Sequence, residues 1–348
     1  MRTTVLFRVD AGPVVGLGHL QRCLSLAGAL RRLEVASVFL VNRTPATQQR
    51  VERFGYEARM ISQSRSWDAA DLSETIALAA VQRCPVVIVD SDHEGERYLR
   101  QLRDAGFFVC ALEDLAPHPF PSQLVVNGDA HARELPYVSS TGETVFLLGP
   151  EYSMLREEFW SIPQRVVREI PQRVLIMLGG DDPYRLMPDI LRVVDACQGH
   201  FTIAAVIGPF FTHVQEIEAT AARLAHPVQL IHAPEAVRDL MLEADVALSA
   251  GGQTLYELAR VGCPTIAVRT AANQDGQVRV FAQQGFLQAV GWAGDRAVIR
   301  LMQEALRCLL SDPQARAAMS AIGQRLIDGQ GALRVAQALA TRQEGLLV

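Results

Sequence analysis

Residues 4–32 read TVLFRVDAGPVVGLGHLQRCLSLAGALRR. The run Thr4–Val9 is mostly apolar and contains β-branched residues, which predicts a strand. A loop with Gly16 and Gly18 follows, and apolar residues then recur at helical spacing from Leu20 to Leu30, which predicts a helix from His19 to about Arg32. Strand, glycine loop and helix in this order form the first half of a βαβ unit, so the segment predicts a parallel sheet.

The same alternation of apolar strands and amphipathic helices continues along the chain. Further strands are expected at 35–41, 85–90, 107–112, 174–178, 202–207, 228–231, 246–249 and 265–268. Some of these runs are apolar throughout, as in strands with both faces covered by helices. The pattern predicts an α/β protein with two Rossmann-like, doubly wound domains facing each other across a cleft.

The segment 151–172 interrupts this rhythm with Pro163, Pro171 and several charges. We expect it to be a linker between an N-terminal domain, 1–150, and a C-terminal domain, 173–348. The tail from 313 to 342 has a helical pattern, broken at Asp328-Gly329-Gln330-Gly331. The expected second domain therefore ends in helices.

Composition excludes several kinds of protein. The 348 residues include 33 Lys+Arg against 38 Asp+Glu, and every one of these cations is arginine. Without lysine, neither Schiff-base chemistry nor a Walker phosphate loop is possible. The net charge of -5 argues against a nucleic-acid partner.

No apolar run is long enough to span a membrane, and the N-terminus has no signal-peptide pattern, so no membrane partner and a cytoplasmic location are expected. The six cysteines are scattered without a CxxC pair, which predicts buried thiols. The oligomeric state is not indicated by the sequence.

The chemistry is expected on the loops that follow the strands. The first candidate loop carries Asp10, Gly16, Gly18 and His19, where glycines allow a ligand to approach the backbone and a helix begins. A histidine at this position can act as a general base because the helix dipole disfavours its protonated form. An ordinary glycine turn with a capping histidine explains the same residues.

The second candidate loop follows the strand that ends at Ser249. Four residues, Gly251 to Thr254, would present their backbone amides to a phosphate at a helix N-terminus. Glu257 lies one turn into that helix, where a carboxylate can accept hydrogen bonds from both hydroxyls of a ribose. The alternative is a first-turn glutamate that only stabilises the helix dipole.

Two further loops are weaker candidates. Asn273 and Gln274 follow a strand and can bind sugar hydroxyls or a diphosphate, although Asn273 also fits a helix N-cap. Gly179 and Gly180 form a tight turn before Asp181-Asp182-Pro183, which also fits a plain helix cap.

Acidic residues follow two more strands. Asp90 and Asp92 with His93, and Glu113 with Asp114, suggest a metal, but they lack the spacing of a coordination set, so no metal is expected. The other histidines are expected to be surface or structural residues: His118, His131, His200, His213, His226 and His232.

Taken together, these segments resemble the UDP-sugar hydrolases of the pseudaminic acid pathway and their SpsG-like relatives in polysaccharide biosynthesis. The similarity runs in order along nearly the whole chain, and no single motif is specific alone. The matching segments are Arg8-Val-Asp10, Gly16-Leu-Gly-His19 with Arg22, Val89-Asp90-Ser91, Leu148-Gly-Pro-Glu-Tyr152 with Leu155-Arg-Glu-Glu-Phe159, Leu178-Gly-Gly180 with Asp182-Pro183, Ser249-Ala-Gly-Gly252 with Thr254 and Glu257, Asn273-Gln274, and Asp328-Gly with Gly331 and Arg334.

The resemblance implies a GT-B architecture and a metal-independent hydrolase without a cofactor. Its substrate would be a small-molecule nucleotide sugar, cleaved between the anomeric carbon and UDP to release a 2,4-diacetamido-2,4,6-trideoxyhexose. His19 matches the water-activating residue and Glu257 the residue that binds the ribose. Asp92 and Ala272 stand where the family usually shows a tyrosine and an acidic residue, which leaves the sugar and the nucleotide open.

The loops and the resemblance together give two candidate catalytic residues, His19 and Asp10. The candidate substrate-binding residues are Arg8, Gly16, Gly18, Arg22, Asp90, Gly179, Gly180, Gly251, Gly252, Gln253, Thr254, Glu257, Asn273 and Gln274. Water attacking opposite the nucleotide would invert the anomeric centre. A GT-B glycosyltransferase, with an acceptor hydroxyl in place of water, and a nonenzymatic nucleotide-sugar-binding protein are the alternatives.

Overall fold

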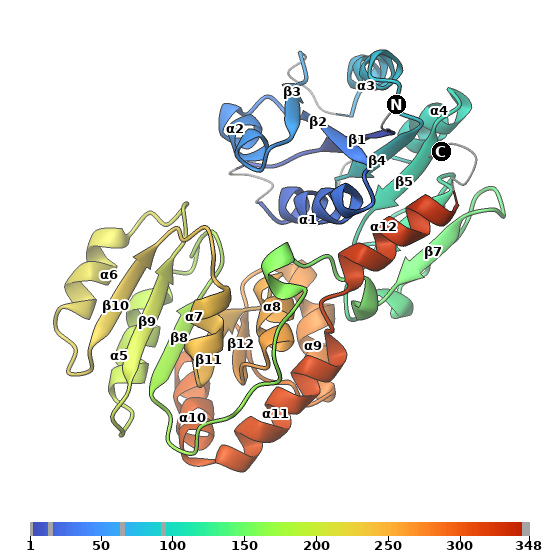
Figure 1. The fold of residues 1–348 in the computed structure, drawn as a ribbon. Helices are drawn as coiled ribbons and strands as arrows, with labels where there is room; N and C mark the ends of the chain where they lie inside the picture. Colours follow the sequence, from blue (N-terminus) through green and yellow to red (C-terminus); the bar gives the residue numbers. More distant parts are fainter. Residues whose placement is uncertain (1–2, 13–16, 63–66, 92–94, 343–348) are drawn as a thin grey trace. The chain divides into compact units, whose positions relative to one another are not determined.

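The computed structural model describes residues 3–12, 17–62, 67–91 and 95–342 (Figure 1). The chain divides into two compact units. Unit 1 contains the described residues up to Trp160 together with those from Gly329 onward, and unit 2 runs from Ser161 to Asp328.

Unit 1 is built on a seven-stranded parallel sheet with the order β3-β2-β1-β4-β5-β6-β7. Its strands are β1 (Thr4–Val9), β2 (Ala36–Val41), β3 (Glu57–Met60), β4 (Val86–Asp90), β5 (Phe108–Leu112), β6 (Leu124–Asn127) and β7 (Val145–Leu148). Its α-helices are α1 (Gly18–Arg32), α2 (Pro45–Arg53), α3 (Ala69–Val81), α4 (Glu96–Asp104) and α12 (Gly331–Thr341). Three 3₁₀ turns complete it: Ala132–Glu134, Pro150–Tyr152 and Glu157–Phe159.

Both faces of this sheet are covered. Phe7 and Val9 of β1 pack into a core with apolar residues of α1 and α12, whereas Leu6 packs on the other face with residues of α3 and α4. This alternation follows from the two-residue period of a strand. Val9 pairs in register with Asp90, so β1 and β4 end side by side.

Unit 2 is built on a six-stranded parallel sheet with the order β10-β9-β8-β11-β12-β13. Its strands are β8 (Arg173–Met177), β9 (Thr202–Ile207), β10 (Val228–His232), β11 (Val246–Ala250), β12 (Thr265–Arg269) and β13 (Leu287–Trp292). Its helices are α5 (Met187–Asp195), α6 (Val214–Ala221), α7 (Arg238–Glu243), α8 (Thr254–Val261), a 3₁₀ turn (Ala272–Gln274), α9 (Asp275–Gln283), α10 (Val298–Ser311) and α11 (Pro313–Leu326).

The last helix differs from the expected domain division, because α12 belongs to unit 1. Ala332, Val335 and Leu339 are buried in the same core as α1. The helix begins at Gly331, where a Cβ would lie 2.1 Å from the carbonyl oxygen of Ser153, so only glycine allows this close approach. The apolar face of α12 therefore packs in the core of unit 1 rather than against the sheet of unit 2.

The expected linker 151–172 also differs, because its residues are divided between the two units. Trp160 is buried in the core of unit 1. Beyond it, Arg165 donates to the carbonyl oxygen of Met241 at 3.2 Å, and Arg316 donates to the carbonyl oxygens of Arg168 and Glu169. These hydrogen bonds fasten 165–169 to unit 2.

Two remaining expectations concern the thiols and the membrane. Five cysteines are buried as expected, but Cys308 is exposed on α10, so the prediction of buried thiols is wrong at that position. Among the helices of the described residues, none is both long and apolar enough to cross a membrane.

Candidate functional site

Each sheet has a point where the strand order reverses, and ligands of open α/β sheets bind beyond the strand ends at that point. In unit 1 it lies between β1 and β4, and in unit 2 between β8 and β11. The loops that carry the candidate residues follow these strands and the neighbouring β12. Of the candidates, Gly16 lies outside the described residues, as do Asp92 and His93.

His19 and Asp90 meet at the reversal point of unit 1. His19 is the second residue of α1, after the exposed Gly18, and its side chain is 12% exposed. Its Nδ1 lies 3.4 Å from Oδ1 of Asp90, the fully buried last residue of β4. A buried carboxylate beside one ring nitrogen favours a proton on that nitrogen and leaves the other free to accept one.

Arg22 holds Asp90 in place from the next turn of α1. Its Nε donates to Oδ2 of Asp90 at 2.7 Å, and its NH2 group donates to Oδ1 at 2.6 Å. Its NH1 group donates to Asp114, which follows β5, and the thiol of Cys23 donates to Asp90 at 3.2 Å. Burial opposes ionisation of Asp90, but Arg22 and His19 outweigh it, so the pKa of Asp90 is lowered.

Arg22 and Asp90 are expected to contact the substrate. In the structure, however, two hydrogen bonds join them to each other, so they hold one another in place. The sequence indicates Asp114 only as a possible metal ligand, because its hydrogen bond to Arg22 joins residues 92 positions apart. Its position shortly after a strand is the one sign in the sequence that it could belong to the site.

Arg8 lies on the other face of the sheet from His19, since it alternates with Val9 along β1, and Asp10, which follows Val9, pairs with Arg8. Arg8 is fully buried, and its NH1 group donates to Oδ1 of Asp10 at 2.8 Å. Oδ2 of Asp10 accepts a hydrogen bond from the indole of Trp67. These contacts do not fit direct substrate binding by Arg8, and they leave Asp10 poorly placed to take a proton from water.

In unit 2, the turn after β11 brings backbone amides together. A Cβ on Gly251 would lie 2.6 Å from Val278 and 2.9 Å from the side chain of Gln274, so this position requires glycine. The side chain of Gln277 donates to the carbonyl oxygen of Gly251 and fixes the turn. At the start of α8, which begins at Thr254, the amides of Leu255 and Tyr256 donate to the carbonyl oxygens of Gly252 and Gln253, and the helix N-terminus carries the positive dipole end.

Polar side chains surround this turn. Gln253 and Thr254 are partly exposed, and Glu257 is buried at 7% exposure one turn into α8. Gln274 accepts a hydrogen bond from the backbone amide of Thr270 at 2.8 Å, while Asn273 is exposed. The arrangement offers neutral donors and one carboxylate, which suits a diphosphate and a ribose.

The glycine turn after β8 lies on the other side of the same reversal point. Gly179 and Gly180 are exposed, and Gly179 has a φ of 91°. Asp182 accepts hydrogen bonds from the amides of Leu186 and Met187 at the start of α5, as in the expected alternative of a helix cap. Nε2 of the buried His213 lies 3.2 Å from Asp182, a structural pairing that sequence reasoning did not identify.

In the part of the chain that the structure describes, no group of three or more histidine, cysteine, aspartate or glutamate side chains is arranged to hold a metal ion.

No protein-family model matches the chain. Among curated proteins, it is similar to the spore coat polysaccharide biosynthesis protein SpsG of Bacillus subtilis, with 27% identity over 62% of this chain and 63% of that protein. It is 22% identical to a Helicobacter pylori protein described as a pseudaminic acid cytidylyltransferase and UDP-2,4-diacetamido-2,4,6-trideoxy-beta-L-altropyranose hydrolase, over 82% of this chain and 48% of that one. An uncharacterized protein of Methanocaldococcus jannaschii, MJ1062, is 24% identical over 74% of this chain and 54% of its own length. The chain thus spans about half to five-eighths of these relatives.

Solved glycosyltransferases share the fold along the whole chain. MurG of Acinetobacter baumannii superimposes with a TM-score of 0.73 at 16% identity, covering 97% of this chain and 99% of MurG. The calicheamicin glycosyltransferase CalG4 gives 0.66 at 15% identity, covering 100% of both chains. The rhamnosyltransferase SpnG with thymidine diphosphate gives 0.65 at 14%, covering 98% of this chain and all of SpnG. The expected GT-B fold is confirmed, whereas the cleft between its domains stays a prediction.

Proposed function

We propose that this protein is a hydrolase of a nucleotide-activated sugar. It would cleave the bond between the anomeric carbon and the diphosphate of a UDP-linked deoxy or acetamido sugar, with inversion. The observation that carries the proposal is His19 at the start of α1, 3.4 Å from the buried Asp90. The descriptions of the Bacillus and Helicobacter relatives support the substrate class.

In this mechanism His19 is the general base. Asp90 lies beside Nδ1, so Nε2 is the ring nitrogen that would accept the proton of the attacking water. A positioned base contributes roughly 10²–10⁴-fold in rate. Arg22 acts through Asp90, which it holds in its ionised form, and Asp114 pairs with Arg22.

The leaving group is assigned to unit 2. The turn at Gly251 and Gly252 and the first amides of α8 would bind the diphosphate, and Glu257 would bind the ribose. Charge that develops on the departing diphosphate is stabilised at the helix N-terminus, by several kcal/mol in order of magnitude. Because a nucleoside diphosphate is already a good leaving group, the two carboxylates of ordinary glycosidases are not needed.

The second candidate is an inverting glycosyltransferase, and the specific observation in its favour is the fold shared with MurG, CalG4 and SpnG. The same base would then activate an acceptor hydroxyl instead of water. A nonenzymatic nucleotide-sugar-binding protein would use unit 2 in the same way and would not need the His19–Asp90 pair.

A panel of UDP-, GDP- and CMP-sugars, assayed for nucleotide release with and without added acceptor alcohols, tests the proposal. We expect release from a UDP-sugar in water alone, and its loss in His19→Asn. Release that requires an acceptor would establish the transferase, and binding without release would establish the binding protein.

A further inference from the structure

Arg8 is an unusual residue for the centre of a sheet, because its guanidinium is fully buried in β1. A buried cation is tolerated only when it is well paired and hydrogen-bonded. Asp71, on the first turn of α3, pairs with it through three hydrogen bonds: Nε donates to Oδ1 at 3.0 Å and to Oδ2 at 3.2 Å, and NH2 donates to Oδ2 at 2.6 Å. NH1 donates to Asp10 at 2.8 Å, so Arg8 links two carboxylates that are 61 positions apart.

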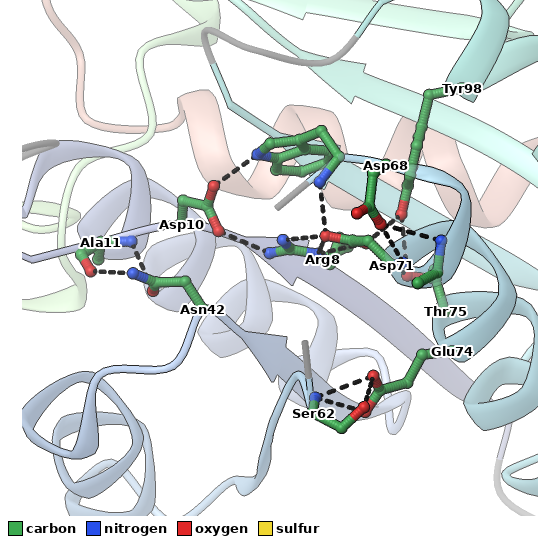
Figure 2. A network of polar contacts seen from close by, with 12 residues as sticks. Arg8, Asp10, Ala11, Asn42, Ser62, Asp68, Asp71, Glu74, Thr75 and Tyr98 are labelled. Atoms are coloured by element: carbon green, nitrogen blue, oxygen red, sulfur yellow. Dashed lines mark hydrogen bonds and ion pairs between the residues drawn. The ribbon is translucent and has the colours of Figure 1, made fainter. Parts of the chain in front are cut away.

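Asp71 is in turn fixed from several sides, as Figure 2 shows. Tyr98 of α4 donates its hydroxyl to Oδ1 at 2.8 Å, and Thr75 lies one helical turn away with its hydroxyl at 3.3 Å. The backbone amide of Trp67 donates to Oδ2 at 2.8 Å. Burial alone would raise the pKa of Asp71, but Arg8 outweighs burial, and the pKa is lowered.

Trp67 closes the cluster above Arg8. Its ring lies over the guanidinium, with 4.2 Å between the Arg8 carbon and the ring centroid, and its indole nitrogen donates to Oδ2 of Asp10. Both carboxylate oxygens of Asp10 therefore accept hydrogen bonds, one from Arg8 and one from Trp67. Arg8 and Trp67 also both contact Asp71. One cation faces two carboxylates, which leaves one negative charge in excess.

The position of Asp10 connects this cluster to the reaction. Asp10 directly follows Val9, which pairs in register with Asp90, the partner of His19. Adjacent strands are about 4.8 Å apart, so the two carboxylates lie at the ends of neighbouring strands. A negative charge there favours the positive charge that develops on an anomeric carbon and on a histidine that has taken a proton.

We propose that Asp71 is a positioning residue for the reaction proposed above: it holds Arg8 and Trp67, and through them it sets the place and charge of Asp10. The inference rests on the proposed function. Asp71 itself does not touch the substrate. Its removal acts on turnover because the excess negative charge is lost and Asp10 is held less firmly.

The test compares Asp71→Asn with Asp68→Ala on the same helix. Asp68 is the N-cap of α3 and accepts hydrogen bonds from the amides of Ala70 and Asp71, so its loss weakens the helix without removing a partner of Arg8. For Asp71→Asn we expect kcat to fall at least tenfold with KM changed less than twofold. For Asp68→Ala we expect a lower Tm and unchanged kcat.

An NMR signal gives a second readout that does not depend on turnover. The indole N–H resonance of Trp67, identified by its loss in Trp67→Phe, reports the hydrogen bond to Asp10. It should move in Asp71→Asn and stay in place in Asp68→Ala. If the wild-type protein releases no nucleotide, the proposed function fails, and an unmoved resonance would separately overturn the link between Asp71 and Asp10.

A double variant keeps the test decisive if Asp71→Asn does not fold. Arg8→Met with Asp71→Leu replaces the buried pair by apolar side chains of similar size, which such sites often tolerate. This variant keeps the negative charge of Asp10 but removes Arg8, which holds Asp10 in place, so a positioning role predicts a folded protein with kcat still reduced at least tenfold. Wild-type kcat in the folded double variant, or a loss of kcat in Asp68→Ala equal to that in Asp71→Asn, would overturn the proposal.

Discussion

The strand ends of the two units carry different kinds of polar groups. In unit 1 they carry ionised side chains in buried pairs: Arg8 with Asp10 and Asp71, and Arg22 with Asp90 and Asp114. In unit 2 the turn after β11 is lined by glycine, amide side chains and the N-terminus of α8, with Glu257 as its buried carboxylate.

This difference suggests that the two units perform different parts of the reaction. Fixed charges and a histidine suit proton transfer and the stabilisation of positive charge, and they require exact placement. Neutral backbone donors suit an anion that must bind and later leave. The proposed function places the chemistry in unit 1 and nucleotide binding in unit 2, and the following changes should separate the two.

The largest effect is expected for His19→Asn, which keeps much of the size of the side chain but removes the base. Turnover should fall by roughly 10²–10⁴-fold. UDP affinity and Tm should stay near wild type, since the nucleotide is assigned to the other unit. His200→Asn, an exposed site at the amino end of β9, is the control. A fall in Tm that parallels the loss of rate would make His19 a structural residue.

Next in size is Asp90→Asn, which leaves Arg22 with one carboxylate fewer. Breaking a buried ion pair costs about 3–5 kcal/mol, so unfolding at neutral pH should become that much easier. Because the pKa of Asp90 is lowered in the folded state, its contribution is complete above the unfolded value of about 3.9 and is lost as the pH falls through the folded value.

Urea unfolding from pH 7 to pH 2 measures this prediction. The stability gap between wild type and Asp90→Asn should be constant above about pH 5 and should narrow below about pH 4. Asp104→Asn, exposed at the end of α4, is the control. A gap that stays the same down to pH 2 would contradict the ionised Asp90–Arg22 pair.

A smaller effect, confined to unit 2, is expected for Glu257→Ala. Loss of hydrogen bonds from a ribose to a carboxylate costs about 1.5–3 kcal/mol, or roughly 10–150-fold in the Kd of UDP. A thermal-shift series with UDP measures it, with the exposed Glu304→Ala on α10 as control. If UDP stabilises wild type and Glu257→Ala equally, Glu257 does not bind the ribose.

The smallest effect is expected from metal removal. The diphosphate is assigned to amides and a helix dipole, so EDTA should change turnover less than twofold. If EDTA abolished turnover and Mg²⁺ or Mn²⁺ restored it, the carboxylates of unit 1, Asp90 first, would have to be metal ligands.

The sequence predicted what depends on local pattern. The segment 4–32 gave β1 and α1 correctly, and the glycines after Ser249 marked the turn before α8. Four strands were missed: β3, β6, β7 and β13. β6 and β7 are only four residues long, whereas β3 and β13 mix polar and apolar residues. That α12 belongs to unit 1 was also missed, because it depends on packing against α1, which no local sequence pattern indicates.

Within the site, the sequence does not predict which residues pair across long stretches of the chain. Asp10, Asp90 and His19 lie in visible motifs, but Asp71 joins Arg8 across 63 residues. Such pairs follow from the strand order and from which helix covers which face, and neither can be read from a local window.

Hydrolysis of the preferred UDP-sugar in H₂¹⁸O shows whether water attacks the anomeric carbon. Mass spectra of both products, taken at early times, show which bond was broken. With His19 activating water, the heavy oxygen should enter the free sugar and UDP should carry none. Label in the terminal phosphate of UDP, with none in the sugar, would contradict attack at the anomeric carbon.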